Sequence, residues 1–174
     1  MEEDALSTKI TPRNRLRRRH ERGSYDIATL YGILDAAMVC HIAYVIDGQP
    51  YCTPTSFWRE GDTLFWHGSS ASRMLRAQSA EIDVCLTVTH VDSLVLARSA
   101  FGHSINYRAA MVFGRASLIT DPAQKKCAAY HFVDRFFPGR SQAIRPPTAK
   151  EMRATSFFPM RIDQASSKIR NLDV

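Results

Sequence analysis

The stretch VCHIAYVIDGQPYCTPTSFW, residues 39–58, decides the fold predicted for this chain. Its first eight residues are rich in β-branched and aromatic side chains, and the Asp47-Gly48 dipeptide that follows is typical of a two-residue turn between antiparallel strands. Residues 49–59 continue as a second strand, in which Pro54 lacks the backbone N–H that a central strand would donate. We therefore predict a β-hairpin whose second strand is either bulged or left with an unpaired edge at Pro54.

The rest of the chain predicts further strands in quick succession, with a few helices between them. Turn residues at 60–62 precede an aromatic strand, and a short turn at Asp92-Ser93 is expected between two later strands. We expect strands at 39–46, 49–59, 63–67, 83–92, 94–101, 107–120 and 156–162. Helices are expected at 26–37, 69–80, 122–137 and 148–153, with a last helical turn near the C-terminus.

This order of elements predicts a mainly β fold with peripheral helices, either an antiparallel barrel of about six to seven strands or a sandwich. Successive antiparallel strands need only short turns, whereas a parallel sheet needs a crossover helix between its strands. A hydrophobic share of 45% in 174 residues is enough for one domain with a substantial core. We expect that domain to span residues 23–174.

The excess positive charge of the chain is concentrated near its N-terminus. Lys and Arg exceed Asp and Glu by six, and residues 9–22 account for all of that excess. A nucleic-acid-binding domain would usually spread its basic residues over a folded face. We therefore interpret residues 1–22 as a basic, flexible arm, and we do not expect a nucleic-acid partner.

Neither a membrane segment nor a secretion signal is expected. No apolar run approaches the ~20 residues that a spanning helix needs, and MEEDALSTK at residues 1–9 is acidic where a signal peptide would be basic. The four cysteines are widely spaced and form neither a CxxC pair nor a metal-ligand cluster, so we interpret them as buried thiols. These features predict a cytoplasmic protein without a metal site.

The segment HGSSASRM, residues 67–74, places a histidine, three hydroxyls and an arginine between a strand and a helix. The start of a helix offers unpaired backbone N–H groups and the positive end of a dipole, so these side chains indicate a phosphate site. Ser69 or Ser70 would equally serve as an ordinary N-cap. The residue types alone leave both interpretations open.

Five segments together resemble the flavin-binding split-barrel superfamily, in the branch related to pyridoxamine 5'-phosphate oxidase that includes nitroimidazole-resistance reductases. They are ERGSYD (21–26), VCHIAYVIDGQPYCTPTSFW (39–58), DTLFWHGSSASRM (62–74), LARSAFGHSINYRAAMVFGRA (96–116) and RPPTAKEMRATSFFPMRI (145–162). The resemblance covers most of the chain after residue 20. It implies a split β-barrel and a homodimer with two flavin sites at the subunit interface, each holding FMN, with FAD as the alternative.

The resemblance also implies where the flavin would bind. Its phosphate would meet Ser72 and Arg73, with help from Ser69 or Ser70, and a guanidinium suits phosphate because it donates two parallel hydrogen bonds. Backbone hydrogen bonds to the ring edge would come from Thr53, Pro54, Thr55 and Ser56, which otherwise form an ordinary edge strand. Polar side chains of the pocket would come from Ser104, Asn106, Tyr107 and Arg108, which would otherwise be dimer contacts.

His67 is the predicted catalytic residue. Its position matches a histidine that some relatives place beside the flavin ring, where an imidazole with a pKa near neutrality could relay a proton; a merely solvated histidine is the alternative. The implied activity is electron transfer from a reduced nicotinamide to a small-molecule substrate such as a nitroaromatic or a quinone. A flavin carrier or redox sensor without turnover is the other candidate function.

Two further families of activity are not expected. Pyridoxamine 5'-phosphate oxidases proper carry a C-terminal segment that completes their substrate site, and QASSKIRNLDV at residues 164–174 has no counterpart to it. Oxidation of pyridoxamine 5'-phosphate is therefore not predicted. The superfamily also contains proteins that degrade haem, but this sequence shows no distinctive haem-ligand signal.

Overall fold

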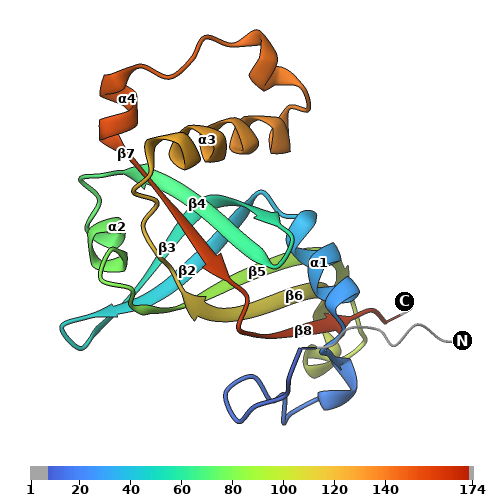
Figure 1. Cartoon of the computed structure of the whole chain (residues 1–174). Coiled ribbons are helices and arrows are strands. Elements are labelled where there is room, and N and C mark those ends of the chain that lie inside the picture. The colour runs from blue at the N-terminus through green and yellow to red at the C-terminus, as the bar shows by residue number, and fades with distance from the viewer. Residues whose placement is uncertain (1–7, 173–174) are drawn as a thin grey trace, which may run out of the picture.

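The computed structural model of the protein describes residues 8–172, and within them eight antiparallel strands form one sheet (Figure 1). The strand order is β1-β8-β6-β5-β2-β3-β4-β7. The strands are β1 Gly23–Ser24, β2 Val39–Ile46, β3 Gln49–Glu60, β4 Thr63–Ser69, β5 Asp83–Val95, β6 Ser104–Arg115, β7 Thr155–Arg161 and β8 Gln164–Arg170. The predicted mainly β, antiparallel fold with peripheral helices is confirmed.

The sheet curls until the end of β6 meets β7. Ala116 forms an isolated antiparallel bridge with Met160, and the backbone N–H of Ser117 donates to the carbonyl oxygen of Pro159 at 3.1 Å. Because the curled sheet encloses one of its faces, the side chains on that face form the core of a barrel. The core includes Leu34, Ile42, Leu64, Trp66, Leu86, Val112 and Phe158, all nearly inaccessible to solvent.

The β2–β3 hairpin forms as predicted. Asp47 and Gly48 have φ angles of 50° and 74°, and positive φ at both turn positions matches the right-handed twist of the flanking strands. β3 runs through Pro54, which lies opposite His41 in an unbroken register, so the predicted bulge does not occur. β4 pairs with β3 only along residues 57–60. The second edge of β3 therefore has no strand partner at 49–56 among the described residues, and the predicted unpaired edge is confirmed.

Four helices pack against the barrel: α1 Ile27–Asp35, α2 Arg73–Gln78, α3 Pro122–Phe136 and α4 Ala149–Ala154. The first two contribute side chains such as Leu34 and Leu75 to its core. Three of them begin where the sequence offers a capping side chain: Asp26, Asp121 and Thr148 each accept a hydrogen bond from a backbone N–H of the first turn. In Figure 1, α3 and α4 lie together over one side of the barrel, next to β4 and β7.

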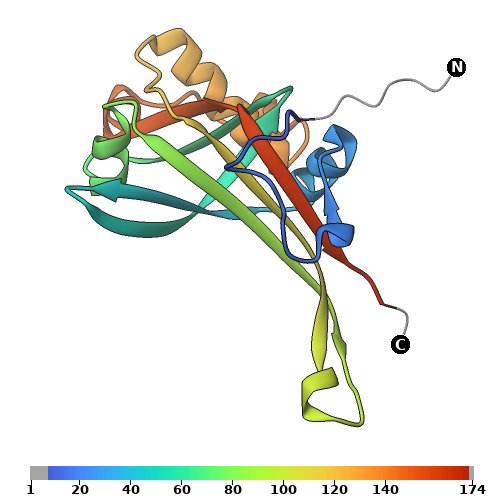
Figure 2. The same ribbon diagram turned by 90° about the horizontal axis from the view of Figure 1, so that it is seen from below.

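The predicted turn at Asp92-Ser93 is wrong, because β5 is one strand of 13 residues that passes through it. The register shifts between Val91 and Ser93, so the polar pair marks a bulge instead of a turn. Asp92 is held across the hairpin by the guanidinium of Arg108, 2.8 Å away, which keeps this stretch extended. The chain reverses at residues 96–103, and the β5–β6 hairpin projects well beyond the barrel (Figure 2).

Two helix predictions are also corrected. The last helical turn is instead β8, whose buried Ser166 and Ser167 pair with β6, because an edge strand was available to cover that side of the sheet. The helix expected at 69–80 begins only at Arg73. Its predicted start, Ser69, still belongs to β4 and pairs with Thr155 of β7.

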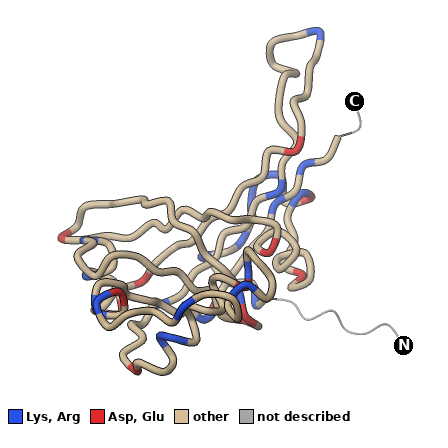
Figure 3. The backbone as a smooth tube through the Cα atoms, turned by 90° about the horizontal axis from the view of Figure 1, so that it is seen from above, with Lys and Arg blue, Asp and Glu red and all other residues tan. Residues whose placement is uncertain are grey.

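Residues 8–22 lie against β8. The side-chain amide of the buried Asn14 donates to the carbonyl oxygens of Lys9 and Ala165 at 2.9 and 3.0 Å, and the Thr8 hydroxyl donates to Ala165 at 3.0 Å. From residue 8 on, the segment expected as a flexible arm is thus tied to the domain, while residues 1–7 lie outside the described residues. Figure 3 shows further basic residues along the chain, including one at the tip of the β5–β6 hairpin.

The cysteines are only partly buried. Cys40 is inaccessible and Cys85 half-buried, but Cys52 and Cys127 are exposed, so the expectation of four buried thiols is wrong for two of them. All four are free. Among residues 8–172, no helix is long and apolar enough to cross a membrane.

Gly114 provides a test of the contact between β6 and β7. A Cβ at this position would lie 2.5 Å from the carbonyl oxygen of Arg161 and 2.8 Å from Cγ of Met160. We expect Gly114→Ala to lower the free energy of unfolding by about 1–3 kcal/mol, measured by urea denaturation. Gly32→Ala in α1 is the matched control, because it meets nothing within 4 Å and should stabilise the helix by about 0.5–1 kcal/mol. Equal effects of the two substitutions would contradict this packing.

Candidate functional site

The free half of β3 carries aromatic and polar side chains next to α2. The rings of Tyr44 and Tyr51 stack with centroids 5.5 Å apart, and the Tyr44 hydroxyl is hydrogen-bonded to Oγ1 of Thr53 at 3.1 Å. The guanidinium of Arg73, the first residue of α2, lies over the Tyr51 ring at 4.4 Å from its centroid. The structure thus brings Arg73 to the strand that contains Thr53, as the resemblance implied.

The start of α2 leaves polar groups available. Ser72 is the N-cap, yet its half-buried side chain makes no capping hydrogen bond. Ser69 Oγ accepts from the backbone N–H of Ala71 at 3.2 Å, and the backbone N–H of Ser70 donates to Ala154 at 2.8 Å, so these two serines are partly engaged. Arg73 is exposed and forms no ion pair with another described residue. Arg73 and Ser72 are therefore the groups best placed to meet an anion.

α2 is fixed to the barrel by a buried hydrogen bond. Nε1 of Trp66 on β4 donates to Oε1 of Gln78 at the end of α2, over 2.9 Å, and both residues are inaccessible to solvent. Such a bond is costly to break, because either polar group would be left unpaired in the core. The position of Arg73 relative to β3 is held by this contact.

The second group of predicted residues lies far from α2 within one chain. Ser104, Asn106, Tyr107 and Arg108 start β6, opposite the last residues of β5, whereas α2 leads into the first residues of β5. At about 3.3 Å per residue, the partner of Ser104 lies ~40 Å along β5 from its first residue, and the partner of Arg108 lies ~23 Å from it. Figure 2 shows α2 and the β5–β6 hairpin at opposite ends of the molecule. A single small ligand cannot touch both groups in one copy of the chain.

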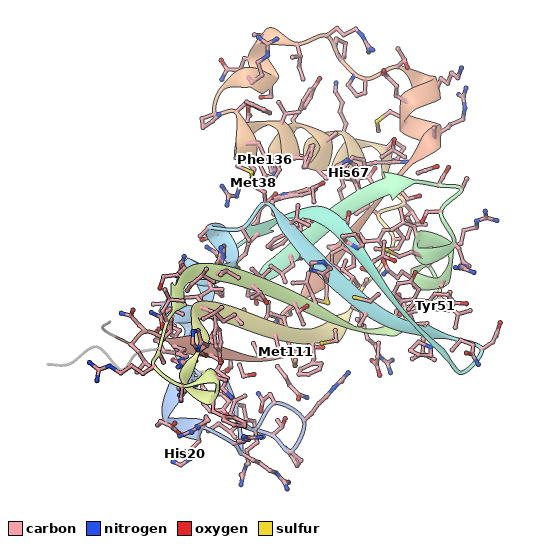
Figure 4. All side chains as sticks on the ribbon, turned by 180° about the vertical axis from the view of Figure 1, so that it is seen from behind. His20, Met38, Tyr51, His67, Met111 and Phe136 are labelled. Carbon is pink, nitrogen blue, oxygen red and sulfur yellow. The ribbon has the colours of Figure 1, made fainter. Side chains whose placement is uncertain are left out.

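Two members of this second group already have partners. The Asn106 amide donates to Leu172 and Ser93, both at 3.0 Å, and its Oδ1 accepts from the backbone N–H of Leu172 at 3.0 Å. Arg108 makes a forked contact with Asp92, which lowers the pKa of that carboxyl. Tyr107 lines a cavity of about 340 Å³ together with Met111, and Figure 4 labels Met111 on the exposed face of the sheet.

His67 lies on the outer face of β4, beneath α3 and α4. Its ring stacks on Phe157 of β7 at 5.1 Å and meets the edge of Phe132 of α3 at 4.4 Å, measured between ring centroids. Its Nδ1 is buried and has no hydrogen-bond partner among the described residues. Burial also lowers the pKa of the imidazole, so the ring is neutral near pH 7. The proton relay at His67 stays a prediction, now with a pKa that burial lowers.

His67 opens onto a cavity of about 420 Å³ between the barrel and the two helices above it. The cavity is lined by His67, Ala129, Phe132, Val133, Pro147, Glu151, Met152, Thr155 and Phe157. A second cavity, of about 360 Å³, shares Phe132 and Val133 with the first and extends to Ser56, the last residue of the free edge of β3. Figure 4 labels Met38 and Phe136 of this second cavity close together, with His67 on the same side of the molecule.

The aromatic cover of His67 was missed from the sequence. The helix at 122–137 was expected, but its Phe132 was not assigned a partner. Phe132 and Phe136 lie four residues apart on one face of the helix, and their ring centroids are 5.1 Å apart. This spacing was the available signal that the helix packs an apolar face against the barrel. Trp58, which follows the buried Phe57 on β3, supplies part of that surface and stacks on Phe65. Tyr51, beneath Arg73, was also missed.

Comparison with known proteins identifies related chains. The family described as pyridoxamine 5'-phosphate oxidase matches residues 26–169. Among solved structures, the flavocytochrome Anf3 from Azotobacter vinelandii is 43% identical, with a TM-score of 0.87 over 94% of this chain and 78% of that chain. The FAD and heme binding protein from Mycobacterium smegmatis is 35% identical, with a TM-score of 0.82 over 87% and 74%.

A more distant structure shares the fold. A 5-nitroimidazole antibiotic resistance protein from Bacteroides thetaiotaomicron is 21% identical, with a TM-score of 0.72 over 84% of this chain and 86% of that chain. The expected split barrel and the expected relation to pyridoxamine 5'-phosphate oxidase are thereby confirmed. No curated protein sequence matches the chain.

The environment of His67 predicts its titration. We expect NMR of the protein without added cofactor to give this imidazole a pKa below its usual value of 6.5, because burial disfavours the charged ring. The same histidine in the urea-unfolded chain is the control. Since the unfolded chain takes up this proton at higher pH than the folded chain, the contribution of His67 to stability is present above pH 6.5 and is lost as the pH falls. A folded-state pKa at or above the unfolded one would contradict this environment.

Proposed function

The chain belongs to the pyridoxamine 5'-phosphate oxidase family, and on that premise we propose that it binds a flavin along the free edge of β3. The observation that carries this proposal is the unpaired edge at residues 49–56, with Arg73 and Ser72 beside it. Relatives at 43% and 35% identity are described as a flavocytochrome and as an FAD and heme binding protein, which supports flavin as the ligand. FMN is the expected form and FAD the alternative.

The residues at this edge fit a flavin in three respects. Thr53 and Thr55 turn their backbone groups toward β2, whereas Cys52, Pro54 and Ser56, which alternate with them, turn theirs toward the free edge. The backbone groups of Pro54 and Ser56 are therefore available to the polar edge of an isoalloxazine ring, with Thr53 and Thr55 beside them. Arg73 and the uncommitted hydroxyl of Ser72 supply donors for a phosphate. The cavity that reaches Ser56 is lined mostly by apolar side chains, which suit an aromatic ring.

We propose that two copies of the chain form the complete site. Measured along β5 from its first residue, the partner of Ser104 lies ~40 Å away and the partner of Tyr107 ~26 Å away, so we infer that these residues contact the same ligand as Arg73 from a partner chain. The projecting β5–β6 hairpin supports this arrangement, because Phe101, Leu96 and Leu94 at its end are exposed apolar side chains that a partner would cover. Pro54, Asn106 and Arg108 remain proposed flavin contacts in this dimeric site.

The proposed activity is electron transfer from a reduced nicotinamide to a small acceptor such as a nitroaromatic or a quinone. A bound flavin supplies reversible two-electron chemistry. The chain supplies the edge that orients the ring, the cation that holds the phosphate and the apolar surface that excludes water. A carrier or redox sensor without turnover has the same binding residues and is the alternative. The four free thiols are consistent with the cytoplasm as the proposed compartment.

Haem is a second proposed cofactor, and a specific cavity favours it. The relatives at 43% and 35% identity are described as a flavocytochrome and as a heme binding protein. In this chain the cavity beneath α3 and α4 is largely apolar and contains an imidazole, which is the setting that haem proteins provide for iron. It shares Phe132 and Val133 with the cavity that reaches Ser56, so the two proposed cofactors would be neighbours.

Arg73→Ala tests the proposed phosphate contact. Charge-assisted hydrogen bonds contribute about 1.5–3 kcal/mol, so we expect the flavin to bind roughly tenfold to a hundredfold more weakly, as measured by quenching of flavin fluorescence. Arg76→Ala on the same helix is the matched control, because Arg76 is exposed and hydrogen-bonds the carbonyl of Ala71 within its own segment. Unchanged affinity in Arg73→Ala would refute the phosphate assignment.

Oxidation of reduced nicotinamide separates the two proposed functions. We expect the flavin-loaded protein to consume NADH or NADPH faster in the presence of a quinone or a nitroaromatic than the same concentration of free flavin does. The reaction is followed by the loss of nicotinamide absorbance. Rates no higher than those of free flavin, with the flavin still bound, would contradict the enzyme and leave the carrier or sensor.

A further inference from the structure

We propose that His67 would hold the iron of a bound haem, in the cavity between strands β4 and β7 and helices α3 and α4. This inference rests on the haem part of the proposed function and assigns the group that would bind the iron. The cavity, of about 420 Å³, is lined by residues of β4, β7, α3 and α4 together with Pro147. His67 is the one imidazole among its nine lining residues.

The lining supplies few other groups that bind iron. Glu151 is committed elsewhere, because its carboxylate caps α4 through Thr148 and accepts two hydrogen bonds from Arg145. Met152 brings a thioether from α4 and is the remaining side chain of a type found opposite histidine in haem proteins. Ala129, Val133 and Pro147 are apolar, and they suit the face and edges of a porphyrin.

The packing around the His67 ring also fits a ligand. Phe157 stacks on one side of the ring and Phe132 meets it edge-on, so its orientation is held by packing. Nδ1 is inaccessible and has no hydrogen-bond partner among residues 8–172, so Nε2 is the ring nitrogen left available to an iron in the cavity.

The sequence context explains why the histidine is available at this position. On β4, Leu64 and Trp66 point into the core, so His67 projects from the opposite, outer face. There β4 has left β3 and pairs only with β7, in which Phe157 is its partner. The strand therefore presents His67 to the space under α3.

The experiment adds haemin to the purified full chain and records the Soret band, with the bound haem quantified as its pyridine complex. We expect the unaltered protein to take up haem with the spectrum of a histidine-ligated iron. In His67→Ala we expect at least about tenfold weaker retention and a shifted Soret band, with added imidazole restoring the original spectrum. His20→Ala is the matched control, because His20 is exposed in the short helix His20–Arg22 and does not line the cavity; it should behave as the unaltered protein.

The possible results separate the inference from the function on which it rests. If the unaltered protein takes up no haemin, the haem part of the proposed function fails, and the assignment of His67 fails with it. If His67→Ala keeps the original Soret band and affinity, haem binding stands but His67 is not its ligand. If that variant keeps its haem and loses only turnover, His67 acts in proton transfer instead. Restoration by imidazole excludes misfolding as the cause of haem loss.

Discussion

The separation of β3 from β4 is the constraint on which both proposed sites depend. The two strands pair only from Phe57–Trp66 to Glu60–Thr63, and beyond Trp66 β4 pairs with β7 alone. On one side of the split, the backbone of β3 is left without a strand at 49–56. On the other side, His67 is carried to the outer face, and the chain turns into α2. One change of strand partner thus creates an edge for a planar ligand and a face for a helix to cover.

An aromatic layer holds helix α3 over the outer face of β4. Trp58, Phe65, Phe157 and Phe132 pack between the sheet and α3, and such aromatic pairs contribute about 0.5–1.5 kcal/mol each beyond their buried area. Glu60 joins the layer to the helix, because Oε1 accepts from Nε1 of Trp58 at 2.6 Å and lies 2.8 Å from Nδ1 of His131. The layer holds α3 above β4 and leaves two adjoining cavities, which share Phe132 and Val133.

Local chemistry in the sequence predicted the elements that depend on neighbours along the chain. The turn at Asp47-Gly48, the free edge at Pro54 and the helix starts at Asp121 and Thr148 each follow from one or two residue types. Elements that depend on residues far away in the sequence could not be predicted in this way. β8 forms because β6 offers it an edge, and β5 stays extended through Asp92 because Arg108 holds it from the next strand.

The candidate site also has parts that the sequence predicts and parts that it does not. The position of Arg73 near β3 and that of His67 on a strand were predictable, because the order and spacing of the sequence segments resemble those of the split-barrel superfamily. The cover of His67 by Phe132 was not, since it depends on how α3 packs. The distance of Ser104 and Tyr107 from Arg73 depends on the full length of β5, which the predicted turn had cut in two.

The visible spectrum of the purified full chain, followed by heat release and chromatographic identification of any bound cofactor, tests the central claim most directly. The account predicts flavin absorption bands and release of FMN or FAD. A colourless protein that also fails to take up added FMN or FAD would contradict it, because the free edge of β3 and the cation beside it would then have no flavin to hold.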